Sequence, residues 1–176
     1  MWKLEIMEEI RNKVKESGLL NLDLALFKPD NTTIASFDIA DYLWQGLVLK
    51  EKEFRAQLAA YDWSFYNGKN VFIHCSADAI IPTWAYMLIG SRLEGVAAFY
   101  MAGSEFELQK ELIRSAITAF DISQYNEERI IIKGCSDIVC PEFAMVLLMS
   151  RLQPVSKSIM YGEPCSTVPL YKAPKK

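Results

Sequence analysis

The feature that most constrains the fold is an internal repeat. Residues 62–103 align with residues 121–162 without a gap, at a constant offset of 59 residues, and 15 of the 42 aligned positions are identical. The identities run from Asp62 and Asp121 to Gly103 and Gly162. A repeat of this length is one supersecondary unit and is too short for a solenoid. The chain is therefore expected to contain the same small motif twice.

Each copy has the composition of a β-α-β motif. An apolar, β-branched run predicts a buried strand, and a proline followed by an apolar stretch predicts a helix with the proline in its first turn. A second strand follows, and such a connection predicts parallel strands with a right-handed crossover. The copies together favour one sheet. The predicted segments are Val71–Ile73, Thr83–Leu93 and Ala97–Ala102 in copy one, and Ile130–Ile132, Glu142–Leu152 and Lys157–Tyr161 in copy two.

Further elements surround the repeat. In residues 1–61, which we predict to be an N-terminal extension, Ile10–Glu16 and Lys50–Tyr61 are typical of helices and Leu19–Phe27 alternates like a strand. Ser104–Phe120 predicts an amphipathic helix after copy one. Copy two lacks this helix, and residues 163–176 are predicted to form a C-terminal loop. We therefore predict a single α/β domain, 1–176, with a mainly parallel or mixed sheet flanked by helices.

Composition excludes several classes of protein. Of the 176 residues 51% are hydrophobic and 23% charged, which excludes a disordered chain. The net charge of −3, with no basic block before Lys175, makes nucleic acid an unfavourable partner. No apolar run approaches the roughly 20 residues of a membrane span, and no signal peptide is recognised. We expect a soluble, cytoplasmic protein without a membrane or nucleic-acid partner; a homo-oligomer stays open.

Three cysteines are predicted at strand ends. Cys75 and Cys135 each follow the first strand of a copy, and Cys165 follows the last strand of copy two. The carboxyl ends of parallel strands share one sheet edge, where ligands bind in open α/β sheets, and a nearby helix N-terminus favours thiolate. The three thiols are thus expected to converge. Cys140 aligns with Ile81 and is interpreted as a core thiol.

Converging thiolates in a reducing compartment predict a bound metal ion. Zinc, or iron in an iron–sulfur cluster, is the expected cofactor, with Cys75, Cys135 and Cys165 as ligands. The fourth ligand is left open between His74, an aspartate (Asp78 or Asp137) and an exogenous group. His74 faces away if the strand runs through Cys75, and the aspartates are also suited to helix capping.

Other interpretations belong to other classes of protein. A thiol enzyme or persulfide carrier would use a helix-capped cysteine, with His74 next to Cys75 as its base. A structural or adaptor module would use aromatic residues such as Trp44, Trp63 and Tyr66. The cysteines are also compatible with three separate caps at strand ends. No glycine-rich phosphate loop is present in the sequence. Catalysis is therefore neither required nor excluded.

Several long motifs resemble one bacterial family. The segments 73–86, 158–172, 16–18, 49–55 and 133–136 are similar to the family labelled domain of unknown function 2480. The resemblance implies shared His-Cys-Ser, Gly-Cys-Ser and Gly-Glu-Pro-Cys-Ser blocks and an accessory role beside iron–sulfur assembly proteins, but no activity. His74–Ser76 and Gly134–Ser136 are also similar to cysteine motifs of iron–sulfur scaffold proteins, which hold a cluster or zinc with three cysteines.

Overall fold

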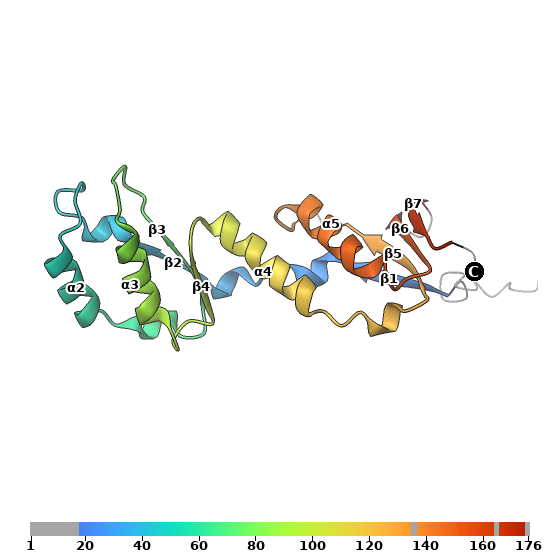
Figure 1. Cartoon of the computed structure of the whole chain (residues 1–176), viewed down its shortest axis with the longest axis horizontal. Helices are drawn as coiled ribbons and strands as arrows, with labels where there is room; N and C mark the ends of the chain where they lie inside the picture. Colours follow the sequence, from blue (N-terminus) through green and yellow to red (C-terminus); the bar gives the residue numbers. More distant parts are fainter. Residues whose placement is uncertain (1–17, 135–136, 164–165, 175–176) are drawn as a thin grey trace, which may run out of the picture. The chain divides into compact units, whose positions relative to one another are not determined.

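The chain divides into two compact units, each containing one copy of the repeat. The structure is a computed structural model that describes residues 18–134, 137–163 and 166–174. Unit 1 consists of Met1–Lys28 and Ala116–Lys176 and contains copy two, whereas unit 2 is Pro29–Ser115 and contains copy one. Unit 2 is thus inserted in the sequence of unit 1 (Figure 1).

Unit 2 is a three-stranded parallel sheet with helices on one face (Figure 1). The strand order is β2-β3-β4, and β3 and β4 are joined by the crossover helix α3. In β3 only every second side chain is buried, because successive side chains in a strand point to opposite faces. The elements are β2 (Ile34–Asp38), α2 (Glu51–Ala60), β3 (Asn70–His74), α3 (Thr83–Leu93) and β4 (Phe99–Ala102).

Aromatic side chains dominate the core of unit 2. Phe37 of β2 is 2% exposed and stacks on Tyr42 and Trp63, with ring centroids 5.2 and 5.4 Å apart. The Tyr66 hydroxyl donates a hydrogen bond to the Ser36 carbonyl at 3.0 Å, which satisfies its polar group at the edge of the core. The ring of Phe54, in α2, is fully buried in the same cluster.

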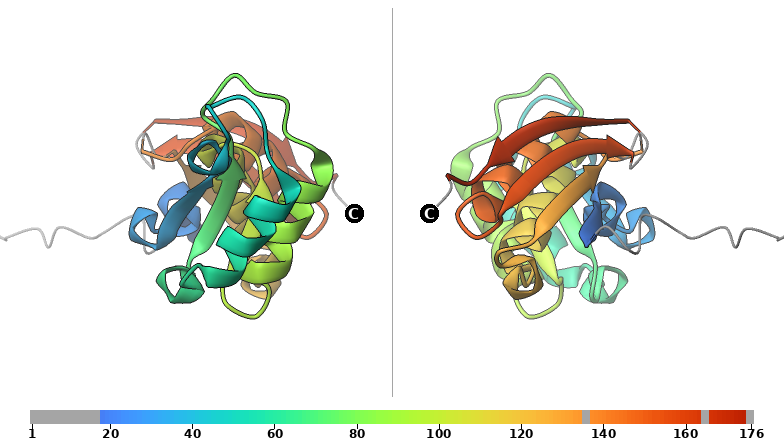
Figure 2. Two further views of the ribbon diagram at one scale, coloured as in Figure 1. Left: turned by 90° about the vertical axis from the view of Figure 1, so that its left-hand side faces the viewer. Right: turned by 90° about the vertical axis from the view of Figure 1, so that its right-hand side faces the viewer.

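Unit 1 is a four-stranded mixed sheet (Figure 2). The strand order is β1-β5-β6-β7; the first three strands are parallel and β7 is antiparallel to β6. Three successive isoleucines of β5, 130–132, are buried, as expected of a central parallel strand covered on both faces. The elements are β1 (Leu19–Asp23), β5 (Arg129–Lys133), α5 (Pro141–Leu152), β6 (Ser158–Glu163) and β7 (Ser166–Lys172).

Helix α4 (Glu105–Ala119) contains the boundary between the units, after Ser115. A capping box starts it: the Ser104 backbone N–H and hydroxyl donate to the Glu107 carboxylate at 2.7 and 2.8 Å. These bonds lower the pKa of Glu107, the backbone N–H most. Within unit 1, the Arg151 guanidinium donates to the carbonyls of Ile117 and Phe120 and so satisfies acceptors at the C-terminal end of α4.

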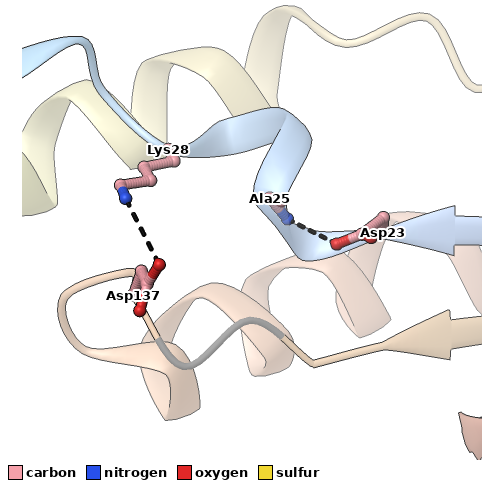
Figure 3. A network of polar contacts seen from close by, with 4 residues as sticks. All are labelled: Asp23, Ala25, Lys28 and Asp137. Atoms are coloured by element: carbon pink, nitrogen blue, oxygen red, sulfur yellow. Dashed lines mark hydrogen bonds and ion pairs between the residues drawn. The ribbon is translucent and has the colours of Figure 1, made fainter.

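The repeat extends to the strands that precede it. β1 and β2 end in the same pattern at an offset of 15 residues, because Leu22, Asp23 and Leu24 correspond to Phe37, Asp38 and Ile39. Asp23 pairs in register with Lys133, and Asp38 with His74, which are corresponding residues of the two copies. The two aspartates cap the 3-10 helices that follow, η1 (Leu24–Phe27) and η3 (Ile39–Tyr42). The Asp23 cap is shown in Figure 3.

The α/β class and the two parallel β-α-β motifs are confirmed. The strands form two sheets and not one, because each copy pairs with its own leading strand. The predicted N-terminal extension supplies one strand to each sheet, and the predicted C-terminal loop contains β7. The single domain stays a prediction. The expected helix Ile10–Glu16 lies outside the described residues. No helix in the described part of the chain is long and apolar enough to cross a membrane.

Candidate functional site

Cys75 and His74 lie at the end of β3 but belong to different environments. The Cys75 side chain is half-buried, packs against the core of unit 2 and donates a hydrogen bond to the Ala77 carbonyl, 3.5 Å from Sγ. The imidazole of His74 lies against the ring of Phe72, with centroids 5.1 Å apart. Phe72 and His74 alternate with the buried Val71 and Ile73. The strand therefore directs His74 away from the face on which Cys75 packs.

Asp38 fixes the loop that carries Cys75. Its Oδ1 accepts the backbone N–H of Ala40 at 2.9 Å and of Ser76 at 3.0 Å. Burial opposes ionisation of this carboxyl, but the hydrogen bonds from Ser76 and Ala40 and the nearby His74 together lower its pKa. Asp38 thus ties the end of β2 to the segment after β3, a structural role.

The prediction of a metal-binding protein is wrong. Among residues 18–134, 137–163 and 166–174, no group of three or more His, Cys, Asp or Glu side chains is placed to hold a metal ion. The argument for convergence assumed one sheet edge, whereas Cys75 follows a strand of the unit 2 sheet. Cys135 and Cys165, predicted as the other ligands, lie outside the described residues. His74 and Cys75 do not form the nucleophile and base of a thiol enzyme either, because they face apart.

Cys140 and Asp137 have local structural surroundings. Cys140 is half-buried and not fully in the core, and it takes a left-handed conformation, with φ of 44°, just before α5. The Asp137 carboxylate lies 3.7 Å from Lys28 Nζ (Figure 3). This contact joins the segment before α5 to the end of η1 within unit 1. Both residues therefore belong to the packing around the start of α5.

An apolar groove lies in unit 1 between α5 and the β6–β7 hairpin. It encloses about 710 Å³ and is the largest hollow found among the described residues. Its floor reaches the end of β5, where Gly134 leaves room for the Tyr161 hydroxyl: a Cβ at Gly134 would lie 2.8 Å from that oxygen. We call this hollow the α5–β7 groove. Its apolar walls are Ile132, Met145, Val146, Met149, Tyr161 and Leu170.

Copy one has a smaller hollow at the corresponding place, between α3 and β4. It encloses about 410 Å³ and includes Ile73, Met87 and Ala102, which correspond to Ile132, Val146 and Tyr161. Tyr100 reduces it by packing on Gly90 of α3, where a Cβ would lie 3.0 Å from its ring. The corresponding residue of copy two, Ile159, is a smaller side chain and fully buried. The groove is therefore enlarged in copy two.

The β6–β7 hairpin explains why the groove is open. A parallel crossover places a helix over the strands that it joins, but a hairpin joins antiparallel strands without one. Tyr161 and Val168 are paired across the hairpin and thus point to one face, and they are 43% and 58% exposed. Leu170, also on β7, is 50% exposed and Val146, on α5, is 70% exposed. Apolar side chains of the helix and the outer strand are left facing solvent.

Charged groups gather at one end of the groove. Glu142 lies in the first turn of α5, and Glu163 ends β6; both line the hollow. Lys133, at the end of β5, forms an ion pair with Glu163, with Nζ and Oε2 2.8 Å apart. The corresponding residues of copy one are the uncharged Thr83 and Ser104. The carboxyl edge of this sheet is therefore apolar in its walls and net negative at its rim.

Sequence reasoning placed functional residues at the correct sheet edge but selected the wrong side chains. It assigned the apolar residues of the α5 segment to the core. A signal for their exposure was present, because Met87 and Val146 occupy the same position of the repeat and are 71% and 70% exposed. The repeat alone does not show that the groove is larger in copy two, since this depends on the hairpin.

Fold and site define an α/β protein with a duplicated β-α-β motif and an open apolar groove in its second copy. The chain belongs to the family DUF2480, described as a protein of unknown function, whose sequence profile matches residues 8–173. The resemblance found in the sequence motifs is thus confirmed. Comparison with the curated proteins and with the solved structures gives no match.

Proposed function

We propose that the protein is an interaction module that binds an amphipathic helix of a partner protein in the α5–β7 groove. The observation that carries this proposal is the exposed apolar surface shared by α5 and β7, beside a groove of about 710 Å³. In α/β sheets such a surface is normally covered by a helix, and here the hairpin leaves it without one. Grooves of this kind take the apolar face of a helix.

The composition of the groove supports a peptide occupant. Met145 and Met149 line its helix wall, and methionine side chains adapt to partners of different shape. Aromatic residues are enriched at protein interfaces, and Tyr161 lies on the opposite wall. A helix with apolar residues at the i, i+3, i+4 and i+7 spacing presents a stripe that matches the length of α5.

The test uses two variants at corresponding positions of the repeat. Val146→Asp places a charge on the wall of the groove, and Met87→Asp makes a similar change at the equivalent exposed position of copy one. The probe is a fluorescein-labelled 14-residue helical peptide with a leucine stripe and otherwise glutamine and alanine, titrated by fluorescence anisotropy. We expect saturable binding to the wild type, a loss of about tenfold or more in affinity for Val146→Asp because an unpaired charge would be buried, and no change for Met87→Asp.

The outcomes separate the possible occupants. No binding of the peptide to the wild type up to 1 mM, or equal losses in both variants, would contradict the proposal. Sedimentation of the protein alone tests a second copy of the chain: a dimer that Val146→Asp converts to a monomer would show that the groove is a homodimer interface. Circular dichroism spectra equal to that of the wild type would show that both variants remain folded, as expected for exposed positions.

A further inference from the structure

We infer that the helix bound in the α5–β7 groove carries lysine or arginine at the end that lies over the carboxyl edge of the sheet. This inference rests on the proposed function and specifies the chemistry of the partner. Glu142 and Glu163 lie at this end of the groove, and both line it. The rim thus offers negative charge beside an apolar wall, which complements a helix that is apolar along its stripe and basic at one end.

The charges at this end do not cancel. Lys133 pairs with Glu163 at 2.8 Å, and Lys28 lies 3.7 Å from Asp137, which is near the start of α5. Each of these ion pairs joins one cation to one carboxylate. Glu142 has no ion pair among the described residues, so the rim retains about one net negative charge. Its side chain is exposed, which leaves it accessible to a partner.

Comparison of the two copies gives an independent argument for a role of these carboxylates. The helix position of Glu142 is Thr83 in copy one, and the strand-end position of Glu163 is Ser104. The acidic residues thus occur in the copy whose groove is large and are replaced by neutral residues where the groove is small. In copy one, the segment after β4 starts α4, with Ser104 in its capping box.

The energetics predict a moderate selectivity. Exposed ion pairs contribute about 0.2–1 kcal/mol each, which corresponds to an affinity change of about 1.4- to fivefold. Such a contribution decreases with added salt because the charges are screened beyond about 10 Å at 0.1 M ionic strength. Charge therefore selects among helices and fixes their direction, whereas the apolar stripe supplies most of the affinity.

The experiment compares three leucine-stripe peptides that differ only at one end, with two lysines, two glutamines or two glutamates. For the wild-type protein we expect the lysine peptide to bind about two- to fivefold more tightly than the neutral peptide and the glutamate peptide to bind more weakly, with a smaller spread in 0.5 M NaCl. Glu142→Lys should reverse the order, and Glu142→Gln should reduce the spread. Thr83→Lys, at the equivalent position of copy one, should leave the order unchanged.

Each outcome bears on one of the two proposals. If all three peptides bind equally, the inference about charge is wrong and the helix-binding module stands. If none binds, the proposed function is wrong as well. If the lysine peptide is preferred but Glu142→Lys does not reverse the order, the selectivity does not come from this rim and the inference is again wrong. A reversal by Glu142→Lys together with an unchanged order in Thr83→Lys supports it.

Discussion

Substitution of Gly162 by alanine tests the geometry of the hairpin that forms the groove. Gly162 pairs with Thr167 near the end of the hairpin and has a φ of 120°, in the region that favours glycine. A Cβ at this position would lie 2.5 Å from the backbone carbonyl oxygen of Ser166. Because that oxygen belongs to the main chain, the conflict is relieved only by moving β7.

The expected cost follows from these two contributions. A residue held in such a backbone conformation costs about 1–3 kcal/mol, and displacement of β7 adds to it, so we expect Gly162→Ala to lower the free energy of unfolding by about 3 kcal/mol. Gly103 is the equivalent residue of copy one, with a φ of 145°, and its Cβ would meet the end of the Glu107 side chain at 2.7 Å. That side chain is able to move, so Gly103→Ala should cost only about 1–2 kcal/mol.

Urea denaturation followed by circular dichroism measures both variants. With a slope of about 2 kcal/mol per molar urea, the midpoint should fall by about 1.5 M for Gly162→Ala and by less than about 1 M for Gly103→Ala. Hydrogen exchange should show the loss of protection in β6 and β7 for the first variant and in β3 and β4 for the second. A loss of less than about 0.5 kcal/mol for Gly162→Ala, or equal losses in the two variants, would refute this reasoning.

Three further predictions concern residues that hold each unit together. Arg151→Ala removes charged donors from the Ile117 and Phe120 carbonyls and should cost about 1.5–3 kcal/mol by urea denaturation, whereas Arg92→Ala, at the equivalent position, should change stability by less than about 0.5 kcal/mol. Asp38→Ala should cost about 1–2 kcal/mol at pH 7. Since the folded-state pKa of Asp38 lies below its ordinary value of 3.8, its charge-dependent stabilisation is present above that value and is lost as the pH falls through the folded-state pKa; an Asp38→Asn variant showing the same pH dependence as the wild type would contradict this. Phe37→Ala should cost about 3–5 kcal/mol and, by hydrogen exchange, expose β2 and β3, and an exchange pattern changed only in unit 1 would contradict the assignment of its core.

Much of the fold was predictable because the repeat carries its own internal check. The helix in copy one matches the prediction at both ends, Thr83–Leu93, and in copy two it begins one residue earlier, at Pro141. A proline in the first turn and an apolar face specify such helices locally. The leading strands were harder to assign, since the offset of their similarity is 15 residues and not 59. Leu24–Phe27, predicted as strand, is a 3-10 helix because Asp23 caps it.

The site was less predictable because it depends on pairing and not on residue type. Cysteines attract attention for their chemistry, but whether they meet depends on which sheet each strand joins. The sequence of β7 contains Pro169, which favours a loop, and the strand tolerates it as an edge strand beside a register shift near Met160. Only the hairpin shows that Val146 and Leu170 share one groove. No local pattern encodes this contact.

The insertion of unit 2 within unit 1 has a consequence for folding during synthesis. Leu19 of β1 pairs with Arg129, so β1 has to wait for about 110 further residues, or roughly 5–20 s at ordinary rates of translation. Unit 2 is complete in sequence long before. In this interval β1 resembles β2 in its Leu22 and Asp23 positions, so it is a competitor for the edge of β3. The earlier emergence of β1 and the later pairing of β5 make strand exchange the characteristic misfolding event for this chain, and the buried Phe37 of β2, larger than Leu22, favours the native choice.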